Sequence, residues 1–293
     1  MRKVIFLMSG LLGLVVASSG LNGPNTMITS AHASDEDVQN QLEAAQKIFA
    51  QRGSVEAPNA VEDTLKLLNG LDKQAEDADL KYDIFVQIAR TYFWKGVHTA
   101  SNEEKKVIFK AGMEGAAAAK ALNSDYADAY YYYAINLGKW GVANGITDSL
   151  GKASELLENF KSAIEDKEGR KRFTRDGKPG ETIDAYGPDR GLGRAYRKLP
   201  GLFGGSTEKS LEVLERANRL GSEYKLNTVY YSATLCSTAG LFSSGRKAEG
   251  LALLEKLVKA GPGPSDYFLY PENLDALRDA KQLLDKKGDD SWL

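Results

Sequence analysis

After residue 34, apolar side chains recur every three to four positions along nearly the whole chain, and strict alternation is almost absent. The first run places Val38, Leu42, Ala45 and Phe49 on one face of a single segment. Residues three and four apart share one side of an α-helix, so this spacing predicts amphipathic helices from residue 34 to the end. We therefore expect an all-α protein.

Three segments repeat one arrangement of large and small residues: 82–96 (YDIFVQIARTYFWKG), 127–141 (ADAYYYYAINLGKWG) and 226–240 (LNTVYYSATLCSTAG). Each has a large residue at the fourth place, alanine at the eighth and glycine at the fifteenth, and a less regular fourth copy begins at Tyr186. The alanines are Ala89, Ala134 and Ala233. A small residue at this place allows two helices to approach closely, and the larger neighbours fill the space beside it.

These segments resemble the first helix of the tetratricopeptide repeat. The first two copies are 45 residues apart, whereas the standard repeat has about 34, so we expect about 11 additional residues near 97–102. The sequence predicts a degenerate tetratricopeptide-like solenoid over residues 34–293, with about four helical hairpins plus terminal helices. A non-repetitive helical bundle is the alternative.

Helix boundaries have their own signals. Ser34 with Asp37, and Ser101 with Glu104, have the spacing of capping boxes and predict two helix starts. Glycine favours the position just beyond a helix, so several glycines predict helix ends. These glycines are Gly53, Gly96, Gly141, Gly221 and Gly261.

Residues 1–33 have the pattern of a signal peptide: two cations, an apolar run over 4–16, and Ala31-His32-Ala33 as a cleavage site. The run is shorter than the roughly 18 residues that cross a membrane, although an uncleaved anchor and an earlier cut at 15–17 stay open. No cysteine follows the run, which excludes a bacterial lipid anchor. We expect residues 34–293 to be released into the periplasm without a membrane span.

Composition removes several classes of function. The chain is 42% hydrophobic and 27% charged, as in ordinary globular proteins. Loss of Arg2 and Lys3 with the leader changes the formal charge from −2 to −4, so nucleic acid is not an expected partner. Beyond the leader, Cys236 is the single cysteine and His98 the single histidine. We expect no metal, no cofactor and no catalytic residue, with Cys236 in the core and His98 as a surface or capping residue.

An unusual string occupies residues 187–211, in which GPDR, GRAYRKLPG, GGS and KSL follow one another. It resembles the signature of the TatT-type T components of TRAP transporters, which are exported tetratricopeptide-like proteins. The resemblance extends over about residues 40–285, although only 186–220 is distinctive. It implies a periplasmic helical solenoid that docks a TRAP-type solute-binding protein and lines a cavity for an apolar ligand.

Three arginines form the main candidate site. In repeats of this type, places 5, 9 and 12 of the first helix face the groove, and in the fourth copy these places hold Arg190, Arg194 and Arg197. The planar guanidinium binds carboxylates with two hydrogen bonds, so the stripe predicts a clamp for an anion or an acidic protein segment. Region 167–200 holds ten Lys/Arg against five Asp/Glu, and its part 167–187 is predicted to be a basic loop. Solvated arginines paired with nearby acids are the alternative reading.

Further groove candidates come from the same places in the other copies: Arg90, Tyr131 and Tyr230, with Trp94 at the end of the first copy. Tyr131 belongs to a run of four tyrosines, in which we expect Tyr130 and Tyr133 to pack inward. Aromatic side chains offer large contact areas, so these positions suit a binding surface, although inter-repeat packing is the alternative.

The favoured function is a non-enzymatic periplasmic binding or scaffold protein, an auxiliary in solute uptake whose partner is a solute-binding protein. A carrier of a small apolar ligand in a solenoid cavity is the alternative, and an envelope enzyme that uses carboxylates is a remote one. The sequence also allows association with further copies of the same chain.

Overall fold

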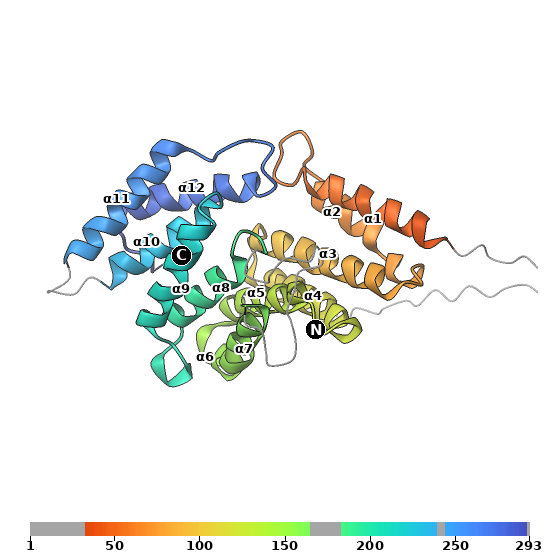
Figure 1. Cartoon of the computed structure of the whole chain (residues 1–293), viewed down its shortest axis with the longest axis horizontal. Coiled ribbons are helices and arrows are strands. Elements are labelled where there is room, and N and C mark those ends of the chain that lie inside the picture. Colours follow the sequence, from red (N-terminus) through yellow and green to blue (C-terminus); the bar gives the residue numbers. More distant parts are fainter. Residues whose placement is uncertain (1–32, 165–182, 239–243, 292–293) are drawn as a thin grey trace, which may run out of the picture. The chain divides into compact units, whose positions relative to one another are not determined.

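A computed structural model describes residues 33–164, 183–238 and 244–291, and all regular structure within these ranges is helical (Figure 1). Contacts divide the chain into one unit of residues 1–32 and a second unit of residues 33–293. Residues 1–32 of the leader predicted over 1–33, and residues 167–182 of the basic loop predicted over 167–187, lie outside the described residues. The all-α class is therefore confirmed for the described part of the second unit.

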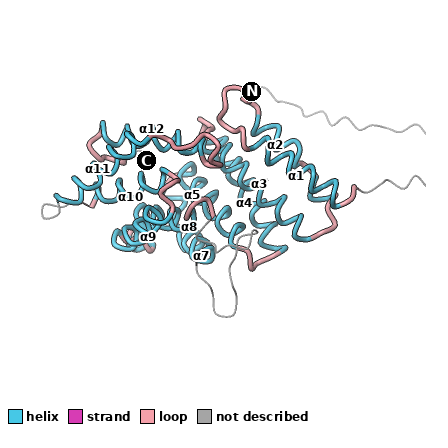
Figure 2. Tube along the Cα trace, turned by 45° about the horizontal axis from the view of Figure 1, so that its top comes forward, coloured by secondary structure: helices cyan, strands magenta, loops and turns pink. Residues whose placement is uncertain are grey.

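Successive helices pack against each other in pairs, and Figure 2 shows them as tubes that lie side by side. The pairs are α1 (Asp35–Phe49) with α2 (Ala60–Leu68), α3 (Ala78–Val97) with α4 (Asn102–Leu122), α5 (Ala127–Asn144) with α7 (Ala153–Ile164), α8 (Gly187–Lys198) with α9 (Thr207–Leu220), and α10 (Lys225–Ser237) with α11 (Ser244–Ala260). Shorter elements are η1 (Leu71–Lys73), α6 (Ile146–Ser149), η2 (Leu150–Lys152) and η4 (Gly201–Phe203). A final helix, α12 (Tyr270–Asp285), packs on α10 and α11. The predicted hairpin arrangement is confirmed.

Local sequence explains where these helices begin. Ser34 and Asp37 form the predicted reciprocal capping box at α1, and Ser101 accepts a hydrogen bond from the backbone of Glu104 at α4. Ser206 caps α9 in the same way. Each cap satisfies a backbone N–H that the first helical turn leaves without an intrahelical partner.

The alanines at the eighth place lie where the repeat predicts them. Ala89, Ala134 and Ala233 have no exposed surface, and Ala89 and Ala134 belong to one core cluster shared by α3, α5, α7 and α8. Asn136 donates a hydrogen bond to the carbonyl of Ala89 over 3.2 Å, which ties α5 to α3. Close helix contact at the small residue is therefore a feature of the fold.

Ala134→Leu should lower the free energy of unfolding by about 1–3 kcal/mol, because the added atoms have no room between packed helices. Thermal or urea unfolding measures the loss. Ala121→Leu, an exposed position on α4, is the matched control and should change stability by less than about 0.5 kcal/mol. Equal stability of the two variants would show that the repeat register is wrong.

Two predicted helix ends are wrong, and packing gives the reason. Gly96 and Gly141 lie inside α3 and α5. A Cβ atom at Gly96 would lie 2.4 Å from Cε1 of Phe109, so this glycine permits close contact between α3 and α4. The additional residues expected near 97–102 lengthen the helices and do not form a long loop. Helices α3 and α4 have 20 and 21 residues, and only four residues join them.

Among the described helices, none is both long enough and apolar enough to cross a membrane. Cys236 is buried, as predicted, and its thiol pKa is raised by burial. His98 is the residue that follows the last turn of α3, which confirms its capping role. Its imidazole stacks on Trp94 with 3.8 Å between ring centroids.

Candidate functional site

One large cavity is lined by the first helices of successive hairpins together with α7 and α12. It has a volume of about 580 Å³, and its walls come from α3, α5, α7, α8, α10 and α12. This volume lies within the range of about 300–1,000 Å³ that is usual for small-molecule sites. The cavity therefore makes the inner face of the helical array the candidate binding site.

Helical spacing decides which side chains reach this cavity. On α12 the lining residues are Glu272, Asp275, Ala276 and Asp279. On α3 they are Arg90, Phe93, Trp94 and Val97. Both sets have the spacing i, i+3, i+4, i+7, so one face of each helix is presented to the cavity.

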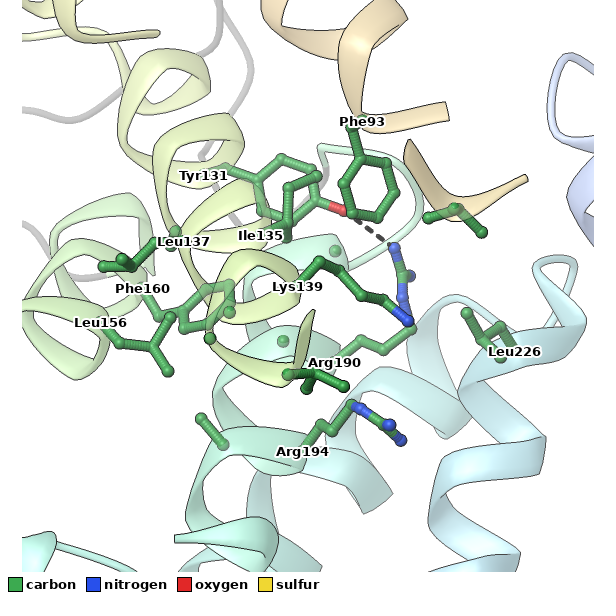
Figure 3. A pocket seen from close by; sticks show the side chains of 18 of the residues that line it. Phe93, Tyr131, Ile135, Leu137, Lys139, Leu156, Phe160, Arg190, Arg194 and Leu226 are labelled. Carbon is green, nitrogen blue, oxygen red and sulfur yellow. Dashed lines mark hydrogen bonds between the residues drawn. The ribbon is translucent and has the colours of Figure 1, made fainter. Parts of the chain in front are cut away.

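Apolar side chains form most of the wall between α5, α7 and α8. Figure 3 shows Leu137, Leu156 and Phe160 grouped on one side of the cavity, with Ile135 and Phe93 nearer its centre. The ring of Phe160 fits against Gly191, where a Cβ would lie 2.2 Å from Cε1 of the ring. A surface of this kind favours an apolar molecule or an apolar part of one.

Arg190 is buried at one end of the cavity, and its guanidinium is held by the protein itself. It donates to the backbone oxygen of Asp184 (3.1 Å), to Asn227 Oδ1 (3.0 Å) and to the hydroxyl of Tyr131 (3.0 Å). Figure 3 shows the last of these bonds as a dashed line. The guanidinium also lies 4.2 Å from the ring centroid of Tyr224. Arg190 therefore organises the cavity wall more than it offers free hydrogen-bond donors.

The turn before α8 has an unusual backbone. Asp184, Ala185 and Tyr186 have φ angles of 46°, 49° and 65°, a left-handed conformation that costs L-residues about 1–2 kcal/mol each. Asn227 Nδ2 donates to the carbonyl of Ala185 over 2.8 Å, which helps to hold this conformation. The result places the Asp184 side chain on the cavity wall.

Asp184 is neutralised where it meets the cavity. Its carboxylate lies 3.6 Å from Arg90 Nη2 and accepts a hydrogen bond of 2.9 Å from the hydroxyl of Tyr132. Arg90 and Asp184 thus form a partly buried ion pair. The stability of such a pair depends on good geometry. Arg90 is one of the predicted site residues, and it lies on the cavity wall.

A second cluster of polar residues is formed by side chains from four different helices. Lys139 of α5, Arg194 of α8, Tyr230 of α10 and Asp279 of α12 are all half-buried and all line the cavity. The guanidinium of Arg194 lies 4.7 Å from the ring centroid of Tyr230. Burial opposes ionisation of Tyr230, but Arg194 and Lys139 outweigh it and lower the pKa of this phenol. The phenol of Tyr230 therefore lies close to two cationic side chains.

The ends of the helical array meet beside the cavity. Arg52, in the loop after α1, is buried and binds both carboxylate oxygens of Glu272 on α12 at 2.7 and 2.8 Å. Next to it, Nε2 of His98 lies 2.9 Å from the carboxylate of Asp275. Figure 1 shows α12 beside the loop that joins α1 to α2. These contacts close the wall between α3 and α12.

Six of the seven predicted site residues line the cavity: Arg90, Trp94, Tyr131, Arg190, Arg194 and Tyr230. Arg197 does not line it. Its guanidinium instead pairs with Asp290 and donates to Ser237 Oγ over 3.0 Å. The three arginines thus do not form one stripe open to a partner, because helix α8 turns Arg197 toward the chain terminus.

The tyrosine run also differs in part from expectation. Tyr131 faces the cavity as predicted, but it is buried together with Tyr132. Tyr130 and Tyr133 are only half-buried, and both rings lie under the ammonium of Lys120, at 4.4 and 4.8 Å. The pair that packs most deeply is therefore the adjacent pair 131–132, because α5 is enclosed by helices on two sides.

Sequence reasoning missed Lys139, Asn227 and the Arg52–Glu272 pair. The sequence could have predicted Lys139, because this residue follows Ile135, a groove position of the second copy, by four residues and so shares its helix face. Asn227 and Arg52 act through partners that are distant in sequence, for which the chain gives no local signal. No group of His, Cys, Asp and Glu able to hold a metal ion occurs among the described residues.

Comparison with protein families matches residues 42–172 to the family described as regulator of microtubule dynamics protein 1-3. The matched stretch is less than half of the chain, begins within α1 and extends past α7. No curated protein matches the chain. The family match contradicts the resemblance to T components of TRAP transporters. The resemblance was therefore wrong, and so was the transport role drawn from it.

The structure explains why the string at 187–211 misled. Its glycines are required by packing: a Cβ at Gly193 would lie 2.5 Å from Leu214, and one at Gly205 would lie 1.8 Å from the carbonyl of Leu199. Ser210 donates to the carbonyl of Gly193 over 2.7 Å. A tight hairpin of α8 and α9 needs such residues whatever the protein does, so the string does not specify a transporter partner.

Proposed function

We propose that the protein is a binding protein or carrier for a small, largely apolar molecule, which it holds in the cavity between its inner helices. The observation that carries the proposal is the cavity of about 580 Å³ with a wall of apolar side chains from α3, α5, α7 and α8. Desolvation of an apolar ligand in such a site supplies the binding free energy.

Three of the four lining carboxylates support binding over catalysis. Asp184 is paired with Arg90, Glu272 with Arg52, and Asp275 with His98. A general acid or base needs a proton that can be exchanged with the substrate, whereas these three groups are engaged in joining helices. Their role is to keep the cavity open and fixed in shape.

The proposal is tested with a neutral fluorescent apolar probe, N-phenyl-1-naphthylamine, and with native mass spectrometry of the purified chain. Wild type should bind the probe, and an apolar ligand should accompany the protein. Ile135→Trp puts a larger side chain into the cavity and should weaken probe binding by about tenfold or more, because the occupied volume is lost.

Val107→Trp is the matched control, since Val107 is 71% exposed on α4 and outside the cavity. It should bind the probe as wild type does. Thermal melts of both variants establish that they are folded. A wild-type chain that binds no apolar probe, or a folded Ile135→Trp variant with unchanged affinity, would overturn the proposal.

A further inference from the structure

Tyr224, the residue that precedes α10, presents a phenol hydroxyl to the cavity. The residue is buried and lines the cavity wall. Within the described ranges, its hydroxyl forms no hydrogen bond with the protein. It also differs from the hydroxyl of Tyr267, which lacks a partner but is enclosed in the interior. The Tyr224 hydroxyl is therefore accessible from the cavity, where a molecule bound from outside can reach it.

The carboxylates close to Tyr224 are bound to other groups. Burial raises the pKa of the Tyr224 phenol well above its usual value, and the negative charges of Glu272 and Asp184 add to this shift. Neither carboxylate forms a hydrogen bond with the phenol, because Glu272 is bound by Arg52 and Asp184 lies beside Arg90. Tyr224 therefore keeps its proton at neutral pH and can donate it to a hydrogen-bond acceptor in the cavity.

Arg190 favours a donor role for this hydroxyl. Its guanidinium lies 4.2 Å from the ring centroid of Tyr224. A cation beside a phenol favours negative charge on the oxygen, so it makes the O–H group a better donor and a poorer acceptor. The same guanidinium donates to the hydroxyl of Tyr131 over 3.0 Å, and the proton of that hydroxyl has no acceptor in the described part of the chain. Both phenols thus have a proton to donate.

The polar and apolar parts of the wall lie on different sides of the cavity. In Figure 3 the guanidinium of Arg190 and the side chain of Leu226 lie on the side opposite to Leu156 and Phe160. A molecule that matches both sides has an apolar body and a hydrogen-bond acceptor at one end. A carbonyl oxygen suits this position, because it accepts hydrogen bonds and does not donate them.

We propose that the bound molecule is an apolar carbonyl compound, of the ketone or quinone class, and that Tyr224 donates a hydrogen bond to its oxygen. This proposal rests on the proposed function, since the apolar body of the molecule occupies the cavity of the carrier. A hydrocarbon of the same shape would displace solvent from the cavity and leave the hydroxyl without a partner, whereas a carbonyl compound supplies the acceptor. The phenol therefore determines specificity between the two.

Two uncharged probes that share a flat ring system test the proposal: 9-fluorenone, which carries a carbonyl group, and fluorene, which has a CH₂ group in its place. Each is competed against N-phenyl-1-naphthylamine on the full chain. Tyr224→Phe removes only the hydroxyl. It should weaken fluorenone binding by about threefold to tenfold, the usual effect of one hydrogen bond between neutral groups, and should leave fluorene binding within about twofold of wild type.

Tyr133→Phe is the matched control, because the Tyr133 hydroxyl donates to Glu155 and the residue does not line the cavity. It should bind both probes as wild type does, and thermal melts establish that both variants are folded. If Tyr224→Phe changes the affinities for the two probes equally or not at all, or if wild type binds the dye but not fluorenone, the carbonyl site is refuted and the carrier function stands. If neither probe nor the dye binds wild type, the proposed function itself fails.

Discussion

Glu272→Gln should lower the free energy of unfolding by about 3 kcal/mol, the usual cost of removing one partner of a buried ion pair. The Arg52 side chain is only 2% exposed, so its charge cannot turn to solvent when the carboxylate is lost. Its remaining neighbours are the carbonyl oxygens of Phe49 and Phe268 and the rings of Phe49 and Trp94, none of which carries a full negative charge.

For a domain of this size the loss corresponds to a decrease in Tm of roughly 6–12 °C. Calorimetry or circular dichroism measures it. Glu114→Gln is the matched control, because its pair with Lys110 has both side chains 68% exposed, and it should change stability by less than about 0.5 kcal/mol. Equal Tm values for Glu272→Gln and wild type would mean that the two ends of the helical array are not joined in solution.

Asn227→Leu should cost about 4 kcal/mol, although it preserves most of the side-chain volume. Asn227 is fully buried and donates to the carbonyls of Ala185, Ala217 and Gly221, and it accepts from Arg190. Leucine would remove these four buried hydrogen bonds, one of them to the Arg190 guanidinium, and a net loss of about 1 kcal/mol for each gives the expected total.

The measurement is urea unfolding, with Asn40→Leu on the exposed face of α1 as the control. The control should stay within about 0.5 kcal/mol of wild type. Because Asn227 also holds the left-handed turn at 184–186, the variant should lose affinity for the neutral apolar probe as well. A stable variant with wild-type affinity would contradict the role assigned to this side chain.

The local sequence was sufficient to predict the helices and their packing in pairs. Apolar spacing, serine caps and the alanines at the eighth place all reflect interactions within a few residues or within one type of helix contact, so they can be read along the chain. The prediction that Gly96 and Gly141 end helices was wrong, because the sequence does not distinguish a glycine that permits close packing from one that ends a helix. Only the neighbouring helix, which brings Phe109 to Gly96, separates the two cases.

The site was predictable to the extent that the repeat fixes which face of each helix points inward. That rule placed Arg90, Tyr131, Arg194 and Tyr230 on the cavity wall. It could not show that Arg190 is satisfied by Tyr131 and Asn227, because hydrogen bonds between hairpins depend on the tertiary arrangement. For the same reason the rule could not show that Arg197 is absent from the cavity wall, since its partner Asp290 is 93 residues away in the sequence.

The contact between the two ends of the helical array has a consequence for cooperativity. In an open array of hairpins each unit touches only its neighbours, so the terminal hairpin can fray while the rest stays folded. Here Arg52 and Glu272 are 220 residues apart, yet they bind each other directly. Neither end can open without breaking this pair, so unfolding should proceed as one transition that spans both ends, and hydrogen exchange in α1 and α12 should slow together.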